Sequence, residues 1–209
     1  MASQLVAAPH AGANHTTAFQ RFTKLVVRRR VPISVVLFTA LVLIDLFVLH
    51  SRPRDVLNLV DPFSACGLLF VIGGLLVRTW AAGTLRKRRE LATTGPYAWV
   101  RHPLYVGSFL MMVGFGILIH DPLTLWVVVG PVAWLYWQAV KSEEKQIAKL
   151  FPTEWPAYAA SVPRFFPRRL LVPRLDDWSF AQWLRNSEYQ AWISSAIAIV
   201  GIQLWHLWR

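Results

Sequence analysis

The stretch "GPYAWVRHPLYVGSFLMMVGFGILIHDPLTLWVVVGPVAWLYWQAVKSEE", residues 95–144, joins a polar motif to two apolar runs and an acidic pair. The runs, 104–119 and 123–140, are separated only by "HDP", which is too short for anything but a tight antiparallel turn. The motif before them contains an arginine, a histidine, two tyrosines and two prolines, more than a simple loop requires. The stretch therefore predicts a helical hairpin whose two chain ends, both rich in polar groups, meet on one side of a membrane.

The rest of the chain is similarly apolar. Of its 209 residues 55% are hydrophobic and only 16% are charged. A transmembrane helix needs about 20 apolar residues, because the hydrocarbon layer is ~30 Å thick and a helix rises ~1.5 Å per residue. Five stretches approach that length: residues 31–49, 62–83, 104–119, 123–140 and 189–208. The predicted fold class is all-α, a polytopic helical membrane protein with about five transmembrane helices.

The positive charge is distributed unevenly along these spans. The formal net charge is +11, and with residue 1 in the cytoplasm 19 of the 22 lysines and arginines lie in or beside the inner segments. Only Arg52, Arg54 and Arg209 lie outside. This is the positive-inside bias of membrane proteins, and such basic clusters also attract anionic lipid. The pattern favours a membrane over nucleic acid as partner, and it predicts a cytoplasmic N-terminus and cytoplasmic polar loops.

The chain is expected to have three parts: a basic cytoplasmic tail at 1–30, a membrane domain at 31–169, and an extension at 170–209 with one more transmembrane helix. The first apolar stretch begins too late for a cleavable signal peptide, so residues 1–20 are interpreted as a disordered tail. Cys66 is the only cysteine, which excludes an internal disulfide and a cysteine-cluster metal site. No two histidines lie at ligand spacing, and no metal site is predicted.

Two charged residues and several glycines lie within the predicted spans. Asp45 and Arg78 fall on opposite sides of the bilayer, so they are not expected to pair; Arg78 would snorkel to the inner surface, and Asp45 would face a polar group or the outer interface. Gly73-Gly74 and Gly114-Phe-Gly116 indicate close helix packing. A phosphate-binding loop would need a strand before the glycines and a helix after them.

The acidic pair Glu143-Glu144 has two interpretations. It is either a solvated helix end neutralised by nearby lysines one turn away, or a carboxylate that binds the ammonium group of a ligand. The second interpretation gains support because the motif at 95–107 brings rings and cations to the same membrane face. Burying these carboxylates without partners would cost several kcal/mol.

Three motifs in order, "GPYAWVRHPLYVG", the acidic pair and "Y-x-x-x-V-P-R-F-F-P", resemble the isoprenylcysteine carboxyl methyltransferase family, which belongs with phospholipid methyltransferases in one membrane superfamily. The resemblance covers about residues 70–168. It implies a helical membrane bundle in which S-adenosylmethionine binds in a cytoplasmic pocket closed by the C-terminal segment.

The resemblance also implies a set of site residues. Glu143 would hold the methionine end of the cofactor, and Arg164 and Glu144 would belong to the catalytic end of the site. The remaining cofactor-binding residues would be Arg89, Glu90, Leu91 and Ala92, all through the backbone, and Tyr97, His102, Pro103, Leu104 and Tyr105.

The sequence departs from the family at a few positions. Eukaryotic members carry an arginine implicated in substrate binding where this chain has Ala139, which leaves recognition of a prenylcysteine carboxylate open. The usual Phe-Gly is Phe151-Pro152, and Trp155 replaces a tyrosine.

Arg164 is a candidate for the role that Ala139 cannot fill. Either it binds lipid phosphate at the membrane surface, as Arg168 and Arg169 would, or its segment folds over the pocket and its planar guanidinium holds a carboxylate of the cofactor or the acceptor.

The expected function is therefore that of an integral membrane methyltransferase, dependent on S-adenosylmethionine, with a lipidic or amphipathic acceptor. Such a protein has mainly to position the nucleophile and exclude water. A carboxylate acceptor needs no base, whereas an amine or thiol does. Two alternatives remain: a sterol-reductase-like enzyme using NADPH, whose pattern differs here at Leu104 and Ser108, and a non-catalytic membrane protein that retains the fold.

Overall fold

The computed structural model describes residues 40–41, 43–49, 51–86, 89–168 and 177–209, and within these ranges the chain is helical, with no strand. The long helices are α3 (Pro62–Thr84), α4 (Pro103–Ile119), α6 (Ala133–Leu150) and α9 (Tyr189–Trp208). The short elements are η1 (Asp45–Leu49), η2 (Gly95–Ala98), α5 (Pro122–Val127), η3 (Val128–Val132), α7 (Trp155–Ser161) and α8 (Phe180–Arg185). The predicted all-α fold class is confirmed.

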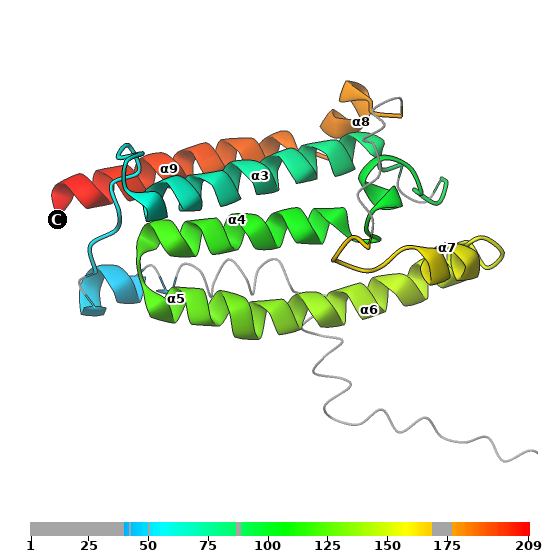
Figure 1. The fold of residues 1–209 in the computed structure, drawn as a ribbon, viewed down its shortest axis with the longest axis horizontal. Coiled ribbons are helices and arrows are strands. Elements are labelled where there is room, and N and C mark those ends of the chain that lie inside the picture. Colours follow the sequence, from blue (N-terminus) through cyan, green and yellow to red (C-terminus); the bar gives the residue numbers. More distant parts are fainter. Residues whose placement is uncertain (1–39, 42, 50, 87–88, 169–176) are drawn as a thin grey trace, which may run out of the picture.

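Successive long helices run antiparallel, and α3 lies between α4 and α9 (Figure 1). In order they are α3, α4, the continuous helix formed by α5, η3 and α6, and α9, which returns along α3. The helices α3, α4 and α9 share one apolar core, built around Val71, Leu118 and Ile202. The helix in the predicted C-terminal extension is therefore an integral part of the bundle.

The contact between α3 and α4 depends on glycines. A Cβ atom added to Gly74 would lie 2.5 Å from the carbonyl oxygen of Gly107, and one added to Gly114 would lie 2.6 Å from that of Gly67. Only residues without side chains allow the backbones to approach this closely. The predicted packing role is thus confirmed for Gly74 and Gly114, whereas Gly73 meets nothing within 4 Å.

The "HDP" turn has the tight form that its length predicts. His120 closes α4 in the left-handed conformation (φ 62), and its amide donates to the carbonyl of Gly116. Asp121 then caps α5 by accepting from the amide of Thr124, and Pro122 occupies the first turn, where its missing N–H is not needed. The hairpin predicted for residues 104–140 is therefore present.

Among the described residues, three helices are long and apolar enough to cross a membrane: Pro62–Thr84, Pro122–Leu150 and Tyr189–Trp208. These contain three of the predicted spans. The predicted third span corresponds to the shorter apolar helix Pro103–Ile119. The predicted first span, 31–49, lies mostly outside the described residues, so a count of five stays a prediction.

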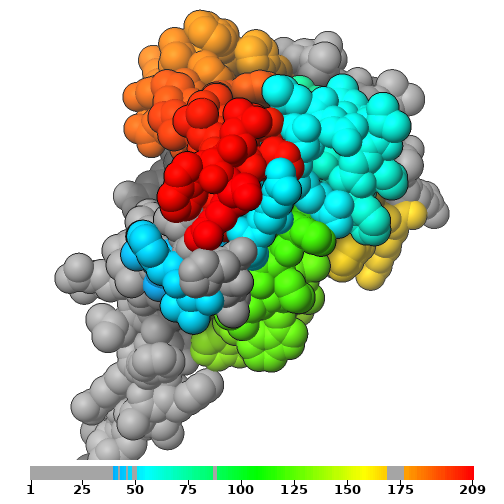
Figure 2. Space-filling view, turned by 90° about the vertical axis from the view of Figure 1, so that its left-hand side faces the viewer, coloured from blue at the N-terminus to red at the C-terminus, as the bar shows by residue number. Residues whose placement is uncertain are grey.

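The bundle has two unlike ends. At one end, the last turns of α9 lie against the loop before α3 (Figure 2). The side chain of His206 bonds the carbonyl of Pro53 (2.7 Å), and Gln203 accepts from the amide of Val56 (2.8 Å). The opposite end carries η2, α7 and α8, and with them most of the described basic residues (Figure 1). The predicted meeting of the polar loops at one end is confirmed.

The charged residues inside the spans do not pair with each other, as expected. Asp45 accepts from the hydroxyls of Ser51 and Thr124, each at 3.3 Å. The expectation that Arg78 snorkels to the inner surface stays a prediction. Its guanidinium makes a bidentate ion pair with Glu188, at 2.6 and 2.9 Å, and also donates to Ser108. Glu188 is distant in sequence but precedes α9 at the same end of the bundle, so it supplies the counter-charge directly.

The segment before α9 also caps the end of α3. Asn186 donates to the carbonyls of Ala82 and Leu85, at 2.8 and 2.9 Å, and the indole of Trp178 donates to that of Thr79. The last carbonyls of a helix have no partner within the helix. The extension therefore supplies the hydrogen bonds that complete the polar end of α3.

Candidate functional site

The motif at 95–107 folds as a short 3₁₀ turn followed by the start of α4. Gly95 has a positive φ of 56°, a conformation that glycine adopts at little cost, and begins η2. His102 is the N-cap residue of α4, and Pro103 follows in its first turn. This geometry places the ring of Tyr105 beside that of His102, with 5.8 Å between centroids.

Glu144 is the centre of an ion cluster at this end of the bundle. Its carboxylate lies 3.1 Å from the guanidinium of Arg101, 3.3 Å from Nε2 of His102 and 2.7 Å from the guanidinium of Arg164. Arg164 also donates through Nε, at 3.0 and 3.1 Å, so its contact uses both carboxylate oxygens. Glu144 is buried, and three partners from two other segments compensate its desolvation.

Backbone hydrogen bonds hold the segment after α7 against the start of α4. The amide of Arg101 donates to the carbonyl of Pro163 at 2.8 Å, and the amide of His102 donates to that of Arg164 at 3.2 Å. The hydroxyl of Tyr158, in α7, donates to the carbonyl of Tyr97 at 2.8 Å. Residues 162–166, here called the closing segment, are thus fixed to the motif by both side chains and backbone.

Glu143 lies next to this cluster but has a different partner. Its carboxylate accepts from the hydroxyl of Tyr105 at 2.9 Å, and the ring of Tyr105 packs edge-on against Tyr136. Within the described ranges no cation lies within ion-pair distance of Glu143. A phenol is a neutral donor, so the carboxylate retains the capacity to bind a cationic group.

The hydroxyl of Tyr97 is buried and has no hydrogen-bond partner among the described residues. Burial, followed by the negative charge of Glu143, raises the pKa of this phenol above its ordinary value. The hydroxyl therefore stays protonated and can donate. An unpartnered buried hydroxyl costs about 1–3 kcal/mol, and a ligand that accepted its hydrogen bond would recover that cost.

The charge states of the cluster follow from burial. Desolvation lowers the pKa of His102 below its ordinary value, although the two neighbouring glutamates oppose the shift. Neutral His102 then donates from Nε2 to Glu144. The hydrogen bond between Arg164 and Glu144 raises the pKa of Arg164, so this guanidinium remains charged.

The other predicted site residues lie at the same end of the bundle. Residues 89–92 follow α3 without helical structure, and the amides of Glu90, Leu91 and Ala92 donate to no other described residue. Leu104 lies with Pro103 in the first turn of α4. The structure thus directly connects His102, Tyr105, Glu143, Glu144 and Arg164, and it places the rest nearby on the chain.

Three residues of this site were not assigned by the sequence. Arg101 lies inside the quoted motif and Tyr158 begins the third one, so the motifs themselves were the available signal. Trp137 had no signal of its own. Its ring lies 5.3 Å from the charged groups of both Arg164 and Lys141, in cation–π geometry.

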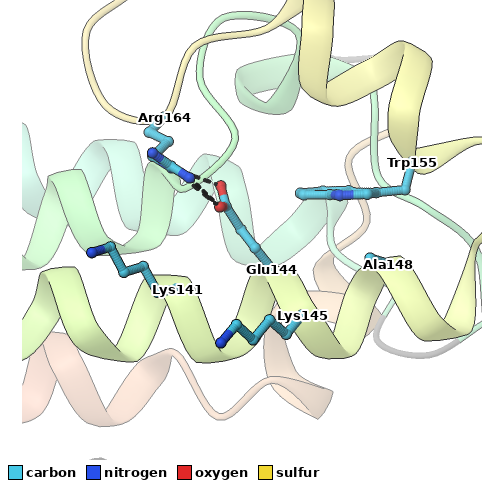
Figure 3. Close-up of a pocket in the computed structure, with 6 residues that line it drawn as sticks. All are labelled: Lys141, Glu144, Lys145, Ala148, Trp155 and Arg164. Carbon is cyan, nitrogen blue, oxygen red and sulfur yellow. Dashed lines mark hydrogen bonds and ion pairs between the residues drawn. The ribbon is translucent and has the colours of Figure 1, made fainter.

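An open groove of about 270 Å³ lies beside the cluster, between α6 and the chain from Trp155 to Arg164 (Figure 3). Figure 3 shows Glu144 pointing from α6 towards Arg164, with Trp155 facing α6 further along. The residues that line the groove are Lys141, Glu144, Lys145, Ala148, Trp155 and Arg164. In the described ranges no three His, Cys, Asp or Glu residues are grouped as a metal ion would require.

Comparison with known proteins agrees with this architecture. The phospholipid methyltransferase family model matches residues 72–154. The nickel-cobalt-cadmium resistance protein NccN of Alcaligenes xylosoxydans xylosoxydans is 35% identical over 131 residues, 62% of this chain and 61% of that protein. The cobalt-zinc-cadmium resistance protein CzcN of Cupriavidus metallidurans is 30% identical over 145 residues, 67% of each chain.

Other relatives are named as enzymes. The protein-S-isoprenylcysteine O-methyltransferase of Saccharomyces cerevisiae is 31% identical over 108 residues, 46% of this chain and 45% of that protein. The rat enzyme of the same name is 32% identical over 134 residues, 58% of this chain and 47% of that protein. The matches thus span from about half to two thirds of these relatives. No solved structure matches the chain significantly.

The fold and the site define an integral membrane protein of helical hairpins with an ion cluster at one end. The matched family model and relatives make the assignment more specific: the chain belongs to the isoprenylcysteine carboxyl methyltransferase-like family of membrane proteins.

Proposed function

We propose that this protein is a membrane methyltransferase that uses S-adenosylmethionine and acts on a lipidic or amphipathic acceptor. The observation that carries the proposal is the joining of three separate motifs at Glu144, which contacts Arg101, His102 and Arg164. The same end also holds a buried hydroxyl at Tyr97 that has no partner among the described residues and could donate to a ligand.

The residues at this end fit the cofactor. Glu143, bonded only by the phenol of Tyr105 among the described residues, would hold the ammonium group. The Tyr97 hydroxyl and the amides of residues 90–92 would donate to polar atoms of the rest of the molecule. When bound, S-adenosylmethionine supplies a methyl group that its sulfonium makes electrophilic.

The chain's own contribution is positioning and the exclusion of water. Glu144 holds Arg164, and with it the closing segment, over the start of α4. We assign Arg164 and Glu144 this positioning role, with a direct contact from Arg164 to a ligand carboxylate as a further step if the pair with Glu144 opens. Excluding water strengthens each electrostatic contact inside the site.

The acceptor is proposed only as a class. Ala139 is buried in α6 and brings no charge to the place where eukaryotic members have an arginine. Prenylcysteine is named only for the relatives, and Ala139 gives no reason to carry it over to this chain. The acceptor proposed here is a lipidic or amphipathic molecule that enters between the helices.

We further propose that this end faces the cytoplasm, because the described basic residues gather there. In a Cys66→Ser background, a cysteine at exposed position 168 should react with an impermeant thiol reagent only from the cytoplasmic side, and one at exposed position 57 only from the other. The reverse labelling pattern would overturn the orientation.

The central test is binding of S-adenosylhomocysteine to the detergent-purified chain by titration calorimetry. Glu143→Gln should weaken binding about 10- to 150-fold, because a hydrogen bond to a charged group contributes roughly 1.5–3 kcal/mol. His102→Ala should also weaken binding, because it removes a contact that holds Glu144 at the start of α4. Glu154→Gln, at an exposed position just before α7, is the matched control and should bind as the wild type does.

Unchanged affinity in both site variants, with unfolding temperatures equal to the wild type, would refute the proposed cofactor site. Binding of NADPH in place of S-adenosylhomocysteine would support the reductase alternative. Binding of neither would indicate a non-catalytic protein.

A further inference from the structure

The groove between α6 and the chain from Trp155 to Arg164 has a chemistry that methyl transfer does not use. We call it the basic groove and define it by its six lining residues, drawn in Figure 3. It is open to the surface, whereas the Tyr97 hydroxyl of the proposed cofactor site is buried. Four of the lining residues, Lys141, Lys145, Ala148 and Trp155, have no part in the proposed binding of the cofactor.

The charges of the basic groove are not balanced. It contains three cations, Lys141, Lys145 and Arg164, and one carboxylate, Glu144. That carboxylate is already bound by Arg164 and by two partners from the start of α4. No carboxylate lies within ion-pair distance of either lysine in the described part of the chain.

Trp137 also concentrates the positive charge. The ammonium of Lys141 and the guanidinium of Arg164 both lie 5.3 Å from its ring centroid. Two cations held on one ring repel each other, and an anion bound between them would remove that repulsion. The arrangement therefore favours an anionic ligand.

The depth of the groove indicates where that anion comes from. The continuous helix from Pro122 to Lys141 rises ~29 Å at ~1.5 Å per residue, close to the ~30 Å of a hydrocarbon layer. Lys141 thus lies at the level where the hydrocarbon ends, and Lys145 lies one turn further out. Phospholipid phosphates lie just beyond the end of the hydrocarbon, at the level between Lys141 and Lys145.

The border of the groove also carries an exposed apolar side chain. Phe166, just after Arg164, is 85% exposed. Trp155 and Ala148 form an apolar wall within the groove. Tryptophan is typical of the interface between headgroups and hydrocarbon.

We propose that the basic groove binds the phosphodiester headgroup of an anionic glycerophospholipid, with Lys141 and Lys145 donating to the phosphate oxygens and Trp155 packing against the outer part of the headgroup. This lipid is bound and not methylated, so the inference goes beyond the proposed function. Because its headgroup would bridge α6 to the chain that carries Arg164, the bound lipid stabilises the closing segment.

The test uses the full-length protein in a neutral detergent and dioctanoyl phosphatidylglycerol as the probe, with binding measured by titration calorimetry. The wild type should show saturable binding. Lys141→Gln or Lys145→Gln should weaken it about 5-fold, and the double variant about 30-fold, given the usual contribution of a lysine near a membrane phosphate. Lys149→Gln removes the same charge from the same helix outside the groove, and should change affinity less than 2-fold.

Two ligand controls separate the sources of binding. Dioctanoyl phosphatidylcholine has the same chains without net charge and should bind more weakly. Inorganic phosphate should show no binding at the same concentrations. Equal binding of phosphatidylcholine, or equal binding of inorganic phosphate, would overturn the proposal in favour of an apolar patch or a soluble-anion site respectively.

The decisive outcome is the comparison between variants. If the double variant binds phosphatidylglycerol as tightly as Lys149→Gln does, the groove is not the site. Its unfolding temperature verifies folding, and the single variants serve if the double variant is unstable. A protein that binds phosphatidylglycerol through these lysines but never binds S-adenosylhomocysteine would refute the proposed function and leave the lipid site intact.

Discussion

Removing the guanidinium of Arg164 should release the closing segment while the bundle stays folded. Arg164 makes three hydrogen bonds to Glu144, at 3.0, 3.1 and 2.7 Å. Hydrogen bonds to charged groups contribute roughly 1.5–3 kcal/mol, but the Arg164 side chain is 36% exposed, so water partly replaces them. Glu144 also keeps Arg101 and His102, which avoids the full penalty of an orphaned buried charge.

The expected loss is about 2 kcal/mol for Arg164→Ala and about 1 kcal/mol for Arg164→Lys, since lysine keeps the charge but not the planar fork. These losses correspond to about 30-fold and about 5-fold changes in the opening equilibrium of the closing segment. The control is Arg168→Lys, at an exposed position on the same stretch. It should change nothing.

Hydrogen exchange is the assay, because the amides of Arg101 and His102 donate to the carbonyls of Pro163 and Arg164. Local opening would accelerate exchange at these two amides by the factors above, with the amides of α3 unaffected. Methyl transfer should fall in the same order among the variants. Unchanged exchange in Arg164→Ala, or equal effects of Arg164→Lys and Arg168→Lys, would show that Arg164 is a membrane anchor and not a closure contact.

Two further predictions concern the packing of the bundle and its response to pH. Gly74→Ala should lower the free energy of unfolding by about 1–3 kcal/mol, because its Cβ would lie 2.5 Å from a backbone oxygen. Gly73→Ala, which meets nothing within 4 Å, should be neutral or stabilising in the same thermal unfolding measurement, and equal effects would contradict the close-packing argument. For pH, burial holds the pKa of His102 below its ordinary 6.5, so the unfolded chain binds a proton near that pH while the folded chain does not. Stability should therefore fall as the pH drops below 6.5, and less so in His102→Asn; identical slopes from pH 7.5 to 5.5 would rule out a buried neutral histidine.

The main features of the fold could be predicted because they depend on local sequence. The "HDP" turn needs only its length and its proline, and the spans need only their hydropathy. The meeting of His102 with Glu144 followed from topology, since the two chain ends of a hairpin must lie on one side. The packing role of Gly74 followed from its place in an apolar helix.

What sequence could not settle depends on long-range contacts. Neighbouring residues on a helix differ by ~100° in direction, so the pair Glu143-Glu144 alone does not show which carboxylate faces the cations. The structure gives Glu144 the ion cluster and Glu143 the phenol of Tyr105. The partner of Arg78 could not be predicted either, because Glu188 lies 110 residues further along the chain.

That separation affects how the protein is made. A ribosome completes α3, with Arg78 near its end, well before Glu188 exists, so during synthesis the guanidinium enters the bilayer margin without its counter-charge. A charged residue within a span disfavours insertion by up to ~2.5–3.5 kcal/mol at the centre of a helix, and by less near its end. The apolar residues of α3 must therefore hold it in place until α9 arrives. Once α9 has left the ribosome, it and the residues just before it bind α3 at both ends. Glu188 and Asn186 make the contacts at one end, and Gln203 and His206 contact the loop before α3 at the other. A chain that stops before α9 would leave α3 in the membrane with an exposed cation, a lesion that quality-control proteases for membrane proteins could recognise.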